Sequence, residues 1–451
     1  MGVEVQFIIA MVLFLALLTA GMAVPFAIAI PAVFYLLMQG GPPALIGLGL
    51  MSWGSMNSFV LTCVPLFMFM AEILRISGLS SRIYGGLSKL VSPLPGGLLQ
   101  TNIAGCAIFA SVSGSSIATA ASIGGVALPQ LVSRNYDRRM SAGSLAAGGT
   151  LGILLPPSFG MIVYGSFTET SVPKLFMAGV IPGVIMTAFF MLYIGVHATL
   201  KPSVAPKERG PQSVAEFFRA LADVLPFAIL IMGTLGGIYA GLVTTTEGAT
   251  IGCLLAIVLG AVFGNLTPRV FIEAMHNTIK FSGNILLIIL TAYIFSYAIS
   301  FAGIGEKVTE FIVGLKLSRL EFFGALFILF TILGCLIESL GMIVITVPLI
   351  FPVLHRYGID PIMFGVVLVL FVELGQISPP IGINLFVIQS IWDGKLQDVV
   401  LGTIPFHIIM FVVLAMVIFW PELALWLPNH LAAKPRSLPY RRAPNTPVTA
   451  P

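Results

Sequence analysis

Apolar runs that are long enough to span a membrane recur along nearly the whole chain, separated by short polar stretches. As a helix, about 20 apolar residues cross the hydrocarbon core of a bilayer. The apolar runs cover residues 5–20, 22–38, 44–74, 98–132, 140–166 and 174–199 in the first half, and 216–240, 246–264, 278–300, 320–355, 361–390 and 397–427 in the second. The two series correspond one for one. The pattern predicts an all-α polytopic membrane protein built from two similar halves.

The two halves also repeat each other in sequence. Residues 129–182 and 352–405 align without a gap at a constant offset of 223 residues, and each contains a Pro-Pro pair, at Pro156 and Pro379. Proline inside a helix removes a hydrogen bond and clashes with the preceding turn. In a membrane, such a break persists where it is buried in protein or lines a cavity. Paired breaks therefore predict two broken helices, about 140–166 and 361–390, at the centre of a secondary transporter.

The segments that precede the broken helices, 98–132 and 320–355, are too long for one simple span. Each has a polar centre, Ser111-Val-Ser-Gly-Ser-Ser116 in the first and Glu338-Ser-Leu-Gly341 in the second. Two arms of about 14 residues would each extend ~20 Å, short of the ~30 Å hydrocarbon core. We therefore predict two re-entrant helical hairpins whose tips lie near mid-membrane.

The longest polar interruption inside the chain, 201–211, separates halves of similar size. The predicted organisation is a first inverted repeat over residues 1–200, a cytoplasmic linker over 201–215, a second inverted repeat over 216–427 and a disordered Pro/Arg-rich tail over 428–451. A tail of such composition cannot bury enough apolar surface to fold.

The distribution of basic residues predicts the orientation. If the hairpins do not cross, each half has five crossings and the halves are inverted. With the linker in the cytoplasm, the basic residues inside are Arg75, Arg82, Lys89, Arg134, Arg138, Arg139, Lys201, Lys207, Arg209, Arg219, Arg269, Lys280 and Lys395. Those outside, before the tail, are Lys174, Lys307, Lys316, Arg319 and Arg356. The excess inside agrees with the positive-inside rule. The same orientation places the tail outside, against that rule.

Composition supports a membrane protein and argues against other classes. Of 451 residues, 58% are hydrophobic and 9% charged, against roughly 25% charged in soluble proteins. The basic residues lie singly in short loops, so no nucleic-acid partner is expected. The four cysteines and five histidines show no metal-ligand or disulfide spacing. Because no nucleophile lies near a base in the pattern, we do not expect an enzyme.

Several polar residues have the spacing of helix caps. Asp360 stands directly before a proline, and Asp137 occupies the same register in the first half. Both are typical of a helix N-cap. The sequences 244–247 and 318–321, Thr-Thr-Thr-Glu and Ser-Arg-Leu-Glu, predict capping boxes at the start of membrane helices.

The tips and breaks offer the ligands that a cation requires. Broken helices leave backbone carbonyls without partners, and their N-termini expose amide donors that favour anions. We expect two pseudo-symmetric sites for sodium as the coupling ion, with no other cofactor. The predicted ligands are Ser113, Gly114, Ser115, Ser116, Gly152, Leu155 and Pro156 in the first half, and Glu338, Ser339, Gly375, Gln376, Ser378 and Pro379 in the second.

The space between the two sites would hold the substrate. No lysine or arginine lies inside a hairpin or a break, so an anion would be bound by helix N-termini, the hydroxyls of Thr119 and Ser158, the amide of Asn384 and bound cations. The alternative for such small residues is close helix packing, but two clusters in matched register favour binding. Glu373 has Thr150 as its counterpart, and we expect a structural hydrogen bond there more than a proton-coupled role.

The residues at the tips and breaks resemble a known family. The stretches 110–120 (ASVSGSSIATA), 152–158 (GILLPPS) and 375–384 (GQISPPIGIN) are similar to the large membrane subunit of tripartite ATP-independent periplasmic (TRAP) transporters. The resemblance covers about residues 5–427. It implies the ion-transporter-superfamily fold, with a scaffold and a mobile domain that carries both hairpins. It also implies an elevator-type transporter driven by a sodium gradient.

The resemblance also implies partners. The family works in the bacterial inner membrane with a separate small four-helix membrane subunit and a periplasmic solute-binding protein. Its substrates are usually carboxylates such as C4-dicarboxylates, sugar acids or keto acids. The alternative is a stand-alone sodium- or proton-coupled dicarboxylate carrier or antiporter of the same superfamily, which needs no binding protein.

Overall fold

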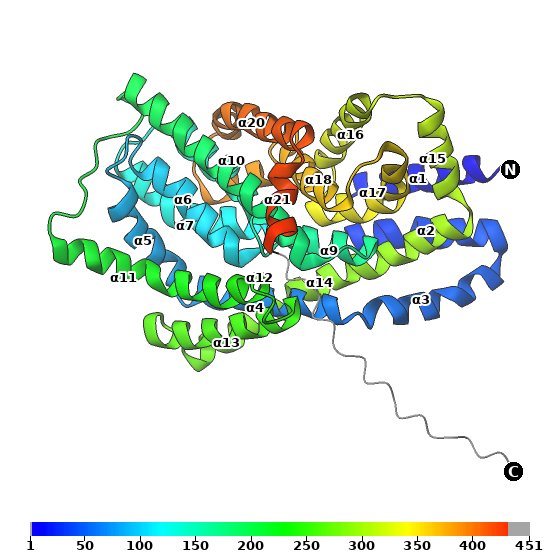
Figure 1. Cartoon of the computed structure of the whole chain (residues 1–451), viewed down its shortest axis with the longest axis horizontal. Helices are drawn as coiled ribbons and strands as arrows, with labels where there is room; N and C mark the ends of the chain where they lie inside the picture. The colour runs from blue at the N-terminus through cyan, green and yellow to red at the C-terminus, as the bar shows by residue number, and fades with distance from the viewer. Residues whose placement is uncertain (1, 432–451) are drawn as a thin grey trace, which may run out of the picture.

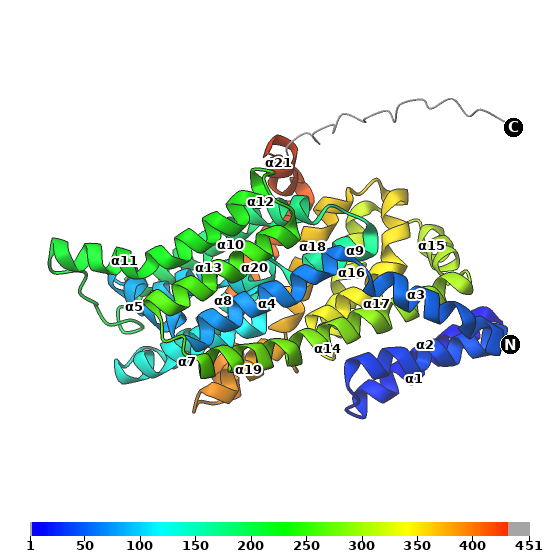
Figure 2. The ribbon, with the colours of Figure 1, turned by 90° about the horizontal axis from the view of Figure 1, so that it is seen from below.

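A computed structural model of the chain describes residues 2–431, and these form helices and connecting turns without a β-strand. Within this part of the chain, nine helical segments are long and apolar enough to cross a bilayer. The predicted all-α polytopic membrane protein is therefore confirmed. Figures 1 and 2 show an elongated molecule, with α1–α3 and α15 at one end and α5 and α11 reaching towards the other.

The helices of the described residues are α1 (Val3–Thr19), α2 (Val24–Gly40), α3 (Ile46–Met56), α4 (Cys63–Ile76), α5 (Leu79–Val91), α6 (Leu98–Ser113), α7 (Ser116–Ser133), α8 (Arg138–Leu154), α9 (Phe159–Thr168), α10 (Val172–Leu200), α11 (Val214–Ile231), α12 (Gly237–Tyr239), α13 (Thr245–Phe263), α14 (Pro268–Phe301), α15 (Ile304–Gly314), α16 (Arg319–Gly334), α17 (Ser339–Leu354), α18 (Pro361–Gln376), α19 (Ile383–Ile391), α20 (Leu396–Phe419) and α21 (Glu422–Leu431). Single turns of 3₁₀- or π-helix lie at Pro42–Leu45, Phe59–Thr62, Met232–Gly236 and His355–Tyr357. Because α21 continues to Leu431, the predicted tail does not begin at residue 428, and the rest of that prediction lies outside the described residues.

The helix boundaries repeat at the sequence offset. The helix α7 begins at Ser116 and α17 begins at Ser339, while α8 begins at Arg138 and α18 at Pro361, in each case 223 residues apart. Both predicted broken helices are interrupted at the Pro-Pro pair, between α8 and α9 and between α18 and α19. The two Pro-Pro peptide bonds are cis. The inversion of the two halves across the membrane stays a prediction.

Each predicted hairpin is a pair of helices joined by a short turn. The first turn is Gly114 and Ser115, and Gly114 has a φ of 65°, which favours glycine. The second turn is longer and covers 335–338. The arms have 16 and 18 residues in the first hairpin and 16 each in the second, longer than predicted. At ~1.5 Å per residue they extend about 24–27 Å, so their re-entrant character stays a prediction.

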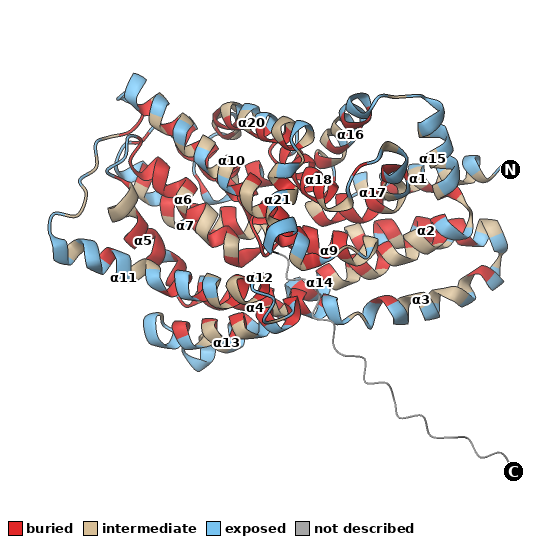
Figure 3. Ribbon diagram, viewed as in Figure 1, coloured by how far each residue is buried: buried red, intermediate tan, exposed pale blue. Residues whose placement is uncertain are grey.

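The core of the molecule lies along the first part of each broken helix. All residues of α8 from Met140 and all residues of α18 from Met363 are buried. Figure 3 shows this buried centre, with exposed residues concentrated on peripheral helices such as α11 and α13. A close backbone approach accounts for the small residues of α8: a Cβ on Gly143 would collide with the backbone of Gly402 in α20. Small residues are typical of such packing in membranes.

The predicted helix caps are confirmed. The side chain of Asp137 accepts a hydrogen bond from Met140 N at 2.8 Å, and Asp360 caps α18 in the same way. Both capping boxes form, at the start of α13 and at the start of α16. These local signals define four helix starts, of which those of α8 and α18 lead to the breaks and that of α16 leads to the second tip.

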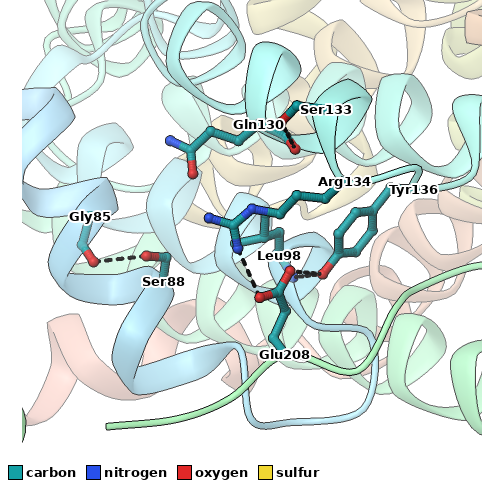
Figure 4. Close-up of polar contacts among 8 residues, drawn as sticks. All are labelled: Gly85, Ser88, Leu98, Gln130, Ser133, Arg134, Tyr136 and Glu208. Carbon is teal, nitrogen blue, oxygen red and sulfur yellow. Dashed lines mark hydrogen bonds and ion pairs between the residues drawn. The ribbon is translucent and has the colours of Figure 1, made fainter.

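The polar linker is packed against the base of the first hairpin. It covers 201–213, two residues fewer than predicted, and Asp137 N donates to Val204 O at 3.0 Å. Figure 4 shows Glu208 accepting hydrogen bonds from Arg134 Nη1 at 2.8 Å and from the Tyr136 hydroxyl at 3.1 Å. The Tyr136 hydroxyl in turn accepts from Leu98 N at 3.0 Å. We call Leu98, Arg134, Tyr136 and Glu208 the linker clamp.

The clamp combines buried and half-exposed groups. Burial raises the pKa of Tyr136 above its ordinary value, so its hydroxyl keeps the proton that it donates to Glu208. The Arg134 side chain is 46% exposed and the Glu208 side chain 16% exposed. Water therefore weakens this ion pair, but it does not reach the tyrosine side of the clamp.

Replacing Glu208 by glutamine is expected to lower the stability modestly, by about 1 kcal/mol, because the ion pair with Arg134 is partly exposed. The thermal unfolding midpoint in detergent measures the loss. Lys207→Gln is the matched control, since the neighbouring lysine makes no ion pair within residues 2–431. Equal midpoints for the two variants would show that the clamp does not hold the linker.

Candidate functional site

The first hairpin tip meets the first helix break directly. The backbone N–H of Phe159, which begins α9, donates to Gly114 O at 3.3 Å. Within the tip, the hydroxyls of Ser113 and Thr119 lie 2.6 Å apart. The Ser115 side chain caps α7 by accepting from Ala118 N. The structure thus brings the first tip and the first break together, as the sequence predicts.

Gly152 and Gly375 occupy matched places in the two halves. A Cβ on Gly152 would collide with the Ser115 carbonyl oxygen and lie 2.7 Å from Thr119 Oγ1. A Cβ on Gly375 would lie 3.0 Å from Gly334 Cα and 3.1 Å from Phe330 O. In each half, the end of the long helix therefore packs backbone to backbone against its hairpin. This contact places the carbonyl of Ser115 beside the end of α8.

One hydrogen bond connects the two predicted sodium sites. The hydroxyl of Ser116, at the start of α7, donates to Gln376 Oε1 at the end of α18 at 2.6 Å. Both residues are buried. The other amide atom, Gln376 Nε2, has no partner among the described residues. The first hairpin and the second broken helix are thus joined through their predicted ligands.

Several predicted ligand oxygens already have protein partners. The hydroxyl of Ser158 donates to Ile153 O at 2.5 Å and accepts from Met161 N, so it caps α9. The hydroxyl of Ser378 donates to Leu374 O at 2.7 Å and lies 2.9 Å from His407 Nε2. In the same break, Pro379 O accepts from Cys335 Sγ. These oxygens have less capacity left for a ligand than free hydroxyls and carbonyls.

Other polar groups in the second half are buried without partners. Both side-chain atoms of Asn384 and both carboxyl oxygens of Glu373 lack a hydrogen-bond partner within the described chain. The structural hydrogen bond expected for Glu373 is therefore not present. In the first half, the predicted ligands Leu155 and Pro156 are also buried, at the break between α8 and α9. Unpaired buried polar groups are rare in folded proteins, and they concentrate where a structure has a function.

A cavity of about 430 Å³ lies between the two hairpin tips. Gly114 and Ser115 line it from the first tip, and Glu338 and Ser339 from the second. Its size fits the range of small-molecule sites. The N-termini of α7 and α17 begin at this wall, and helix N-termini favour anions. Two predicted half-sites thus share one space.

A sequence profile of the DctM component of tripartite ATP-independent periplasmic transporters matches residues 11–423. The chain belongs to the DctM family of TRAP large permeases. It is 32% identical to the C4-dicarboxylate TRAP transporter large permease of Pseudomonas aeruginosa, over 86% of this chain and 91% of that protein. It is 28% identical to the sialic acid TRAP large permease of Vibrio cholerae, over 92% and 96%. Relatives named as permeases support a transport protein and not an enzyme.

The fold of this TRAP permease is shared with a distant transporter. The crystal structure of Alcanivorax borkumensis YdaH superposes with a TM-score of 0.60, covering 87% of this chain and 90% of YdaH, at 15% identity. At that identity the likeness shows the fold alone. It agrees with the multi-pass helical architecture described above.

The cavity of the permease also contains groups that the sequence did not single out. Besides the tips, Glu72 and Arg75 line it from α4, and Asn284 lines it from α14. The positive-inside count placed Arg75 among loop charges, and no motif surrounds Asn284. By contrast Thr119, Ser158 and Asn384, predicted as substrate contacts, are buried and do not line the cavity here. Only the long-range packing of α4 and α14 onto the tips reveals this wall.

Proposed function

We propose that this TRAP large permease imports an organic anion, a carboxylate, coupled to a sodium gradient across the bacterial inner membrane. It would receive the substrate from a periplasmic solute-binding protein and work with a separate small membrane subunit. The observation that carries the proposal is the cavity shared by both tips, with the start of α7 and the start of α17 in one wall. Two helix N-termini that face one space favour an anion.

Sodium would bind beside this space. The carbonyl of Ser115 and the hydroxyls of Ser113 and Thr119 cluster at the first break. Such hard oxygens suit an alkali cation, and a bound cation would offset the negative potential of Glu338 at the second tip. An anion and its coupling ions would then occupy neighbouring sites in one body. This arrangement makes binding of each dependent on the other.

A hydrogen bond between the halves supports an elevator movement. The bond between Ser116 and Gln376 joins the first hairpin to the second broken helix, so we propose that both hairpins and both broken helices move together. The helices α4 and α14 also line the cavity and would belong to the scaffold. The names of the two relatives mention C4-dicarboxylates and sialic acid, which are carboxylates, and they support this substrate class.

Uptake in proteoliposomes tests the proposal. The permease reconstituted with its small subunit and binding protein is expected to take up a radiolabelled carboxylate only with an inward sodium gradient. Omitting the binding protein is expected to remove at least about nine-tenths of the uptake at low substrate, because tethered delivery raises the local concentration. A potassium gradient is the control. Full uptake by the permease alone would instead identify a stand-alone carrier.

A further inference from the structure

Arg75 lines the same cavity as the two hairpin tips, from a different helix, α4. It lies in the last turn of α4, and its side chain is 40% exposed. It is the cation among the residues that line the cavity between the tips. The neighbouring Glu72 is 10% exposed and lines the same wall. A residue that carries a guanidinium thus lines the space in which the helix N-termini favour an anion.

The guanidinium is held in a fixed orientation. Arg75 Nε donates to Glu72 Oε1 at 3.1 Å, and Arg75 Nη2 donates to Glu72 Oε2 at 2.8 Å. Glu72 is itself held, because Asn277 Nδ2 donates to its Oε2 at 3.3 Å. A carboxylate that is bonded to two helices leaves the guanidinium little freedom to rotate.

This pairing uses one edge of the guanidinium and leaves another available. Glu72 engages Nε and one N–H of Nη2, and the Arg75 side chain makes no other hydrogen bond within residues 2–431. Arginine carries more N–H donors than these. The remaining donors, on Nη1 and Nη2, form the second fork of the group. Such a fork matches a carboxylate through two parallel hydrogen bonds.

We propose that Arg75 binds a carboxylate group of the substrate through this second fork, with Glu72 as its positioning residue. The proposal rests on the proposed function. One anionic end of the substrate would lie at the tips, near Ser115 and Ser339, and another carboxylate would reach Arg75 across the cavity. Arg75 would therefore select substrates that carry a carboxylate at the end remote from the tips.

Discrimination between two probes tests this role. The assembled transporter is assayed for uptake of a dicarboxylate such as succinate and of its monoamide, which lacks one carboxylate. Arg75→Ala and Arg75→Lys are compared with Arg82→Lys. Arg82 is the matched control, because it pairs with Asp223 at 2.7 Å, is 38% exposed and does not line the cavity.

Arg75→Lys is expected to raise the KM for the carboxylate probe about tenfold while the maximal rate stays within about twofold, since the charge remains and the fork is lost. The KM for the amide should change little, so the preference for the carboxylate falls by the same factor. Glu72→Gln should raise the carboxylate KM less, because it loosens the orientation and keeps Arg75. Arg82→Lys should keep the wild-type preference.

Three outcomes would overturn the proposal. In the first, the Arg75 variants keep the wild-type preference at the wild-type KM. In the second, Arg82→Lys loses the preference as much as Arg75→Lys does, which would indicate a general effect on folding. A wild type that takes up no carboxylate would overturn the proposed function and this inference with it. If Arg75→Ala does not assemble, Arg75→Lys carries the test, and its elution profile from size-exclusion chromatography checks that it has folded.

Discussion

Gly152→Ala is expected to lower sodium-driven uptake at least about tenfold, while Gly125→Ala leaves it unchanged. The added Cβ would collide with the Ser115 carbonyl oxygen, which is backbone and cannot rotate away as a side chain could. Overpacking of this kind costs about 1–3 kcal/mol. The tip must move away from α8, and the oxygens that we assign to sodium move with it. Gly125 lies in α7, an arm of the first hairpin, and a Cβ there would meet no atom within 4 Å.

A sodium titration of uptake measures this effect separately from expression. The half-saturating sodium concentration is expected to rise in Gly152→Ala, and Gly375→Ala should show a smaller rise because its nearest contacts lie at 3.0 and 3.1 Å. Expression and monodispersity in detergent are checked for all three variants. Wild-type sodium dependence in Gly152→Ala would contradict the assignment of the first site.

Ser116→Ala is expected to destabilise the protein by about 1–3 kcal/mol, because it leaves the buried Gln376 amide without its remaining partner. The change removes an oxygen and keeps the packing almost intact. Replacing both partners, as Ser116→Ala with Gln376→Leu, should cost less than the sum of the two single changes, since no polar atom is then left unpaired. Thermal unfolding of the four proteins completes the cycle.

The same four proteins report on coupling between the halves. Because the bond joins residues from both predicted sodium sites, Ser116→Ala should also raise the sodium concentration at which uptake is half-maximal. Additive stability changes, together with an unaltered sodium titration, would show that the bond between Ser116 and Gln376 is incidental. Ser122→Ala serves as a control, because the buried Ser122 hydroxyl, on the same helix, has no hydrogen-bond partner among the described residues.

Local signals in the sequence predicted much of the fold. Proline, glycine and capping residues act within a few positions, so the breaks at Pro156 and Pro379 and the helix starts at Asp137 and Asp360 follow from neighbouring residues. The turn at Gly114 has the same origin. Because the second half repeats the sequence of the first, the same signals recur there, and α7 and α17 begin at equivalent positions.

The site itself was less predictable, for two physical reasons. The pairing of Arg75 with Glu72 is local, but its place in the same cavity as the tips depends on how α4 packs across the molecule, and no sequence spacing encodes that packing. The hydroxyls of Ser158 and Ser378 find carbonyl partners four or five residues back. These backbone carbonyls can accept the hydroxyls only because the helix is interrupted there. The detailed geometry of the break decides this, and composition does not specify that geometry.

The linker clamp sets a limit on how far the proposed moving body can travel. Glu208 is fixed to the base of the first hairpin, and α11 begins at Val214. Fully extended, the chain between them reaches at most about 20 Å. The hairpin base therefore cannot withdraw from the start of α11 beyond this tether unless the clamp opens. While the clamp stays closed, the length of this short polar segment therefore limits the proposed stroke of the hairpin base relative to α11.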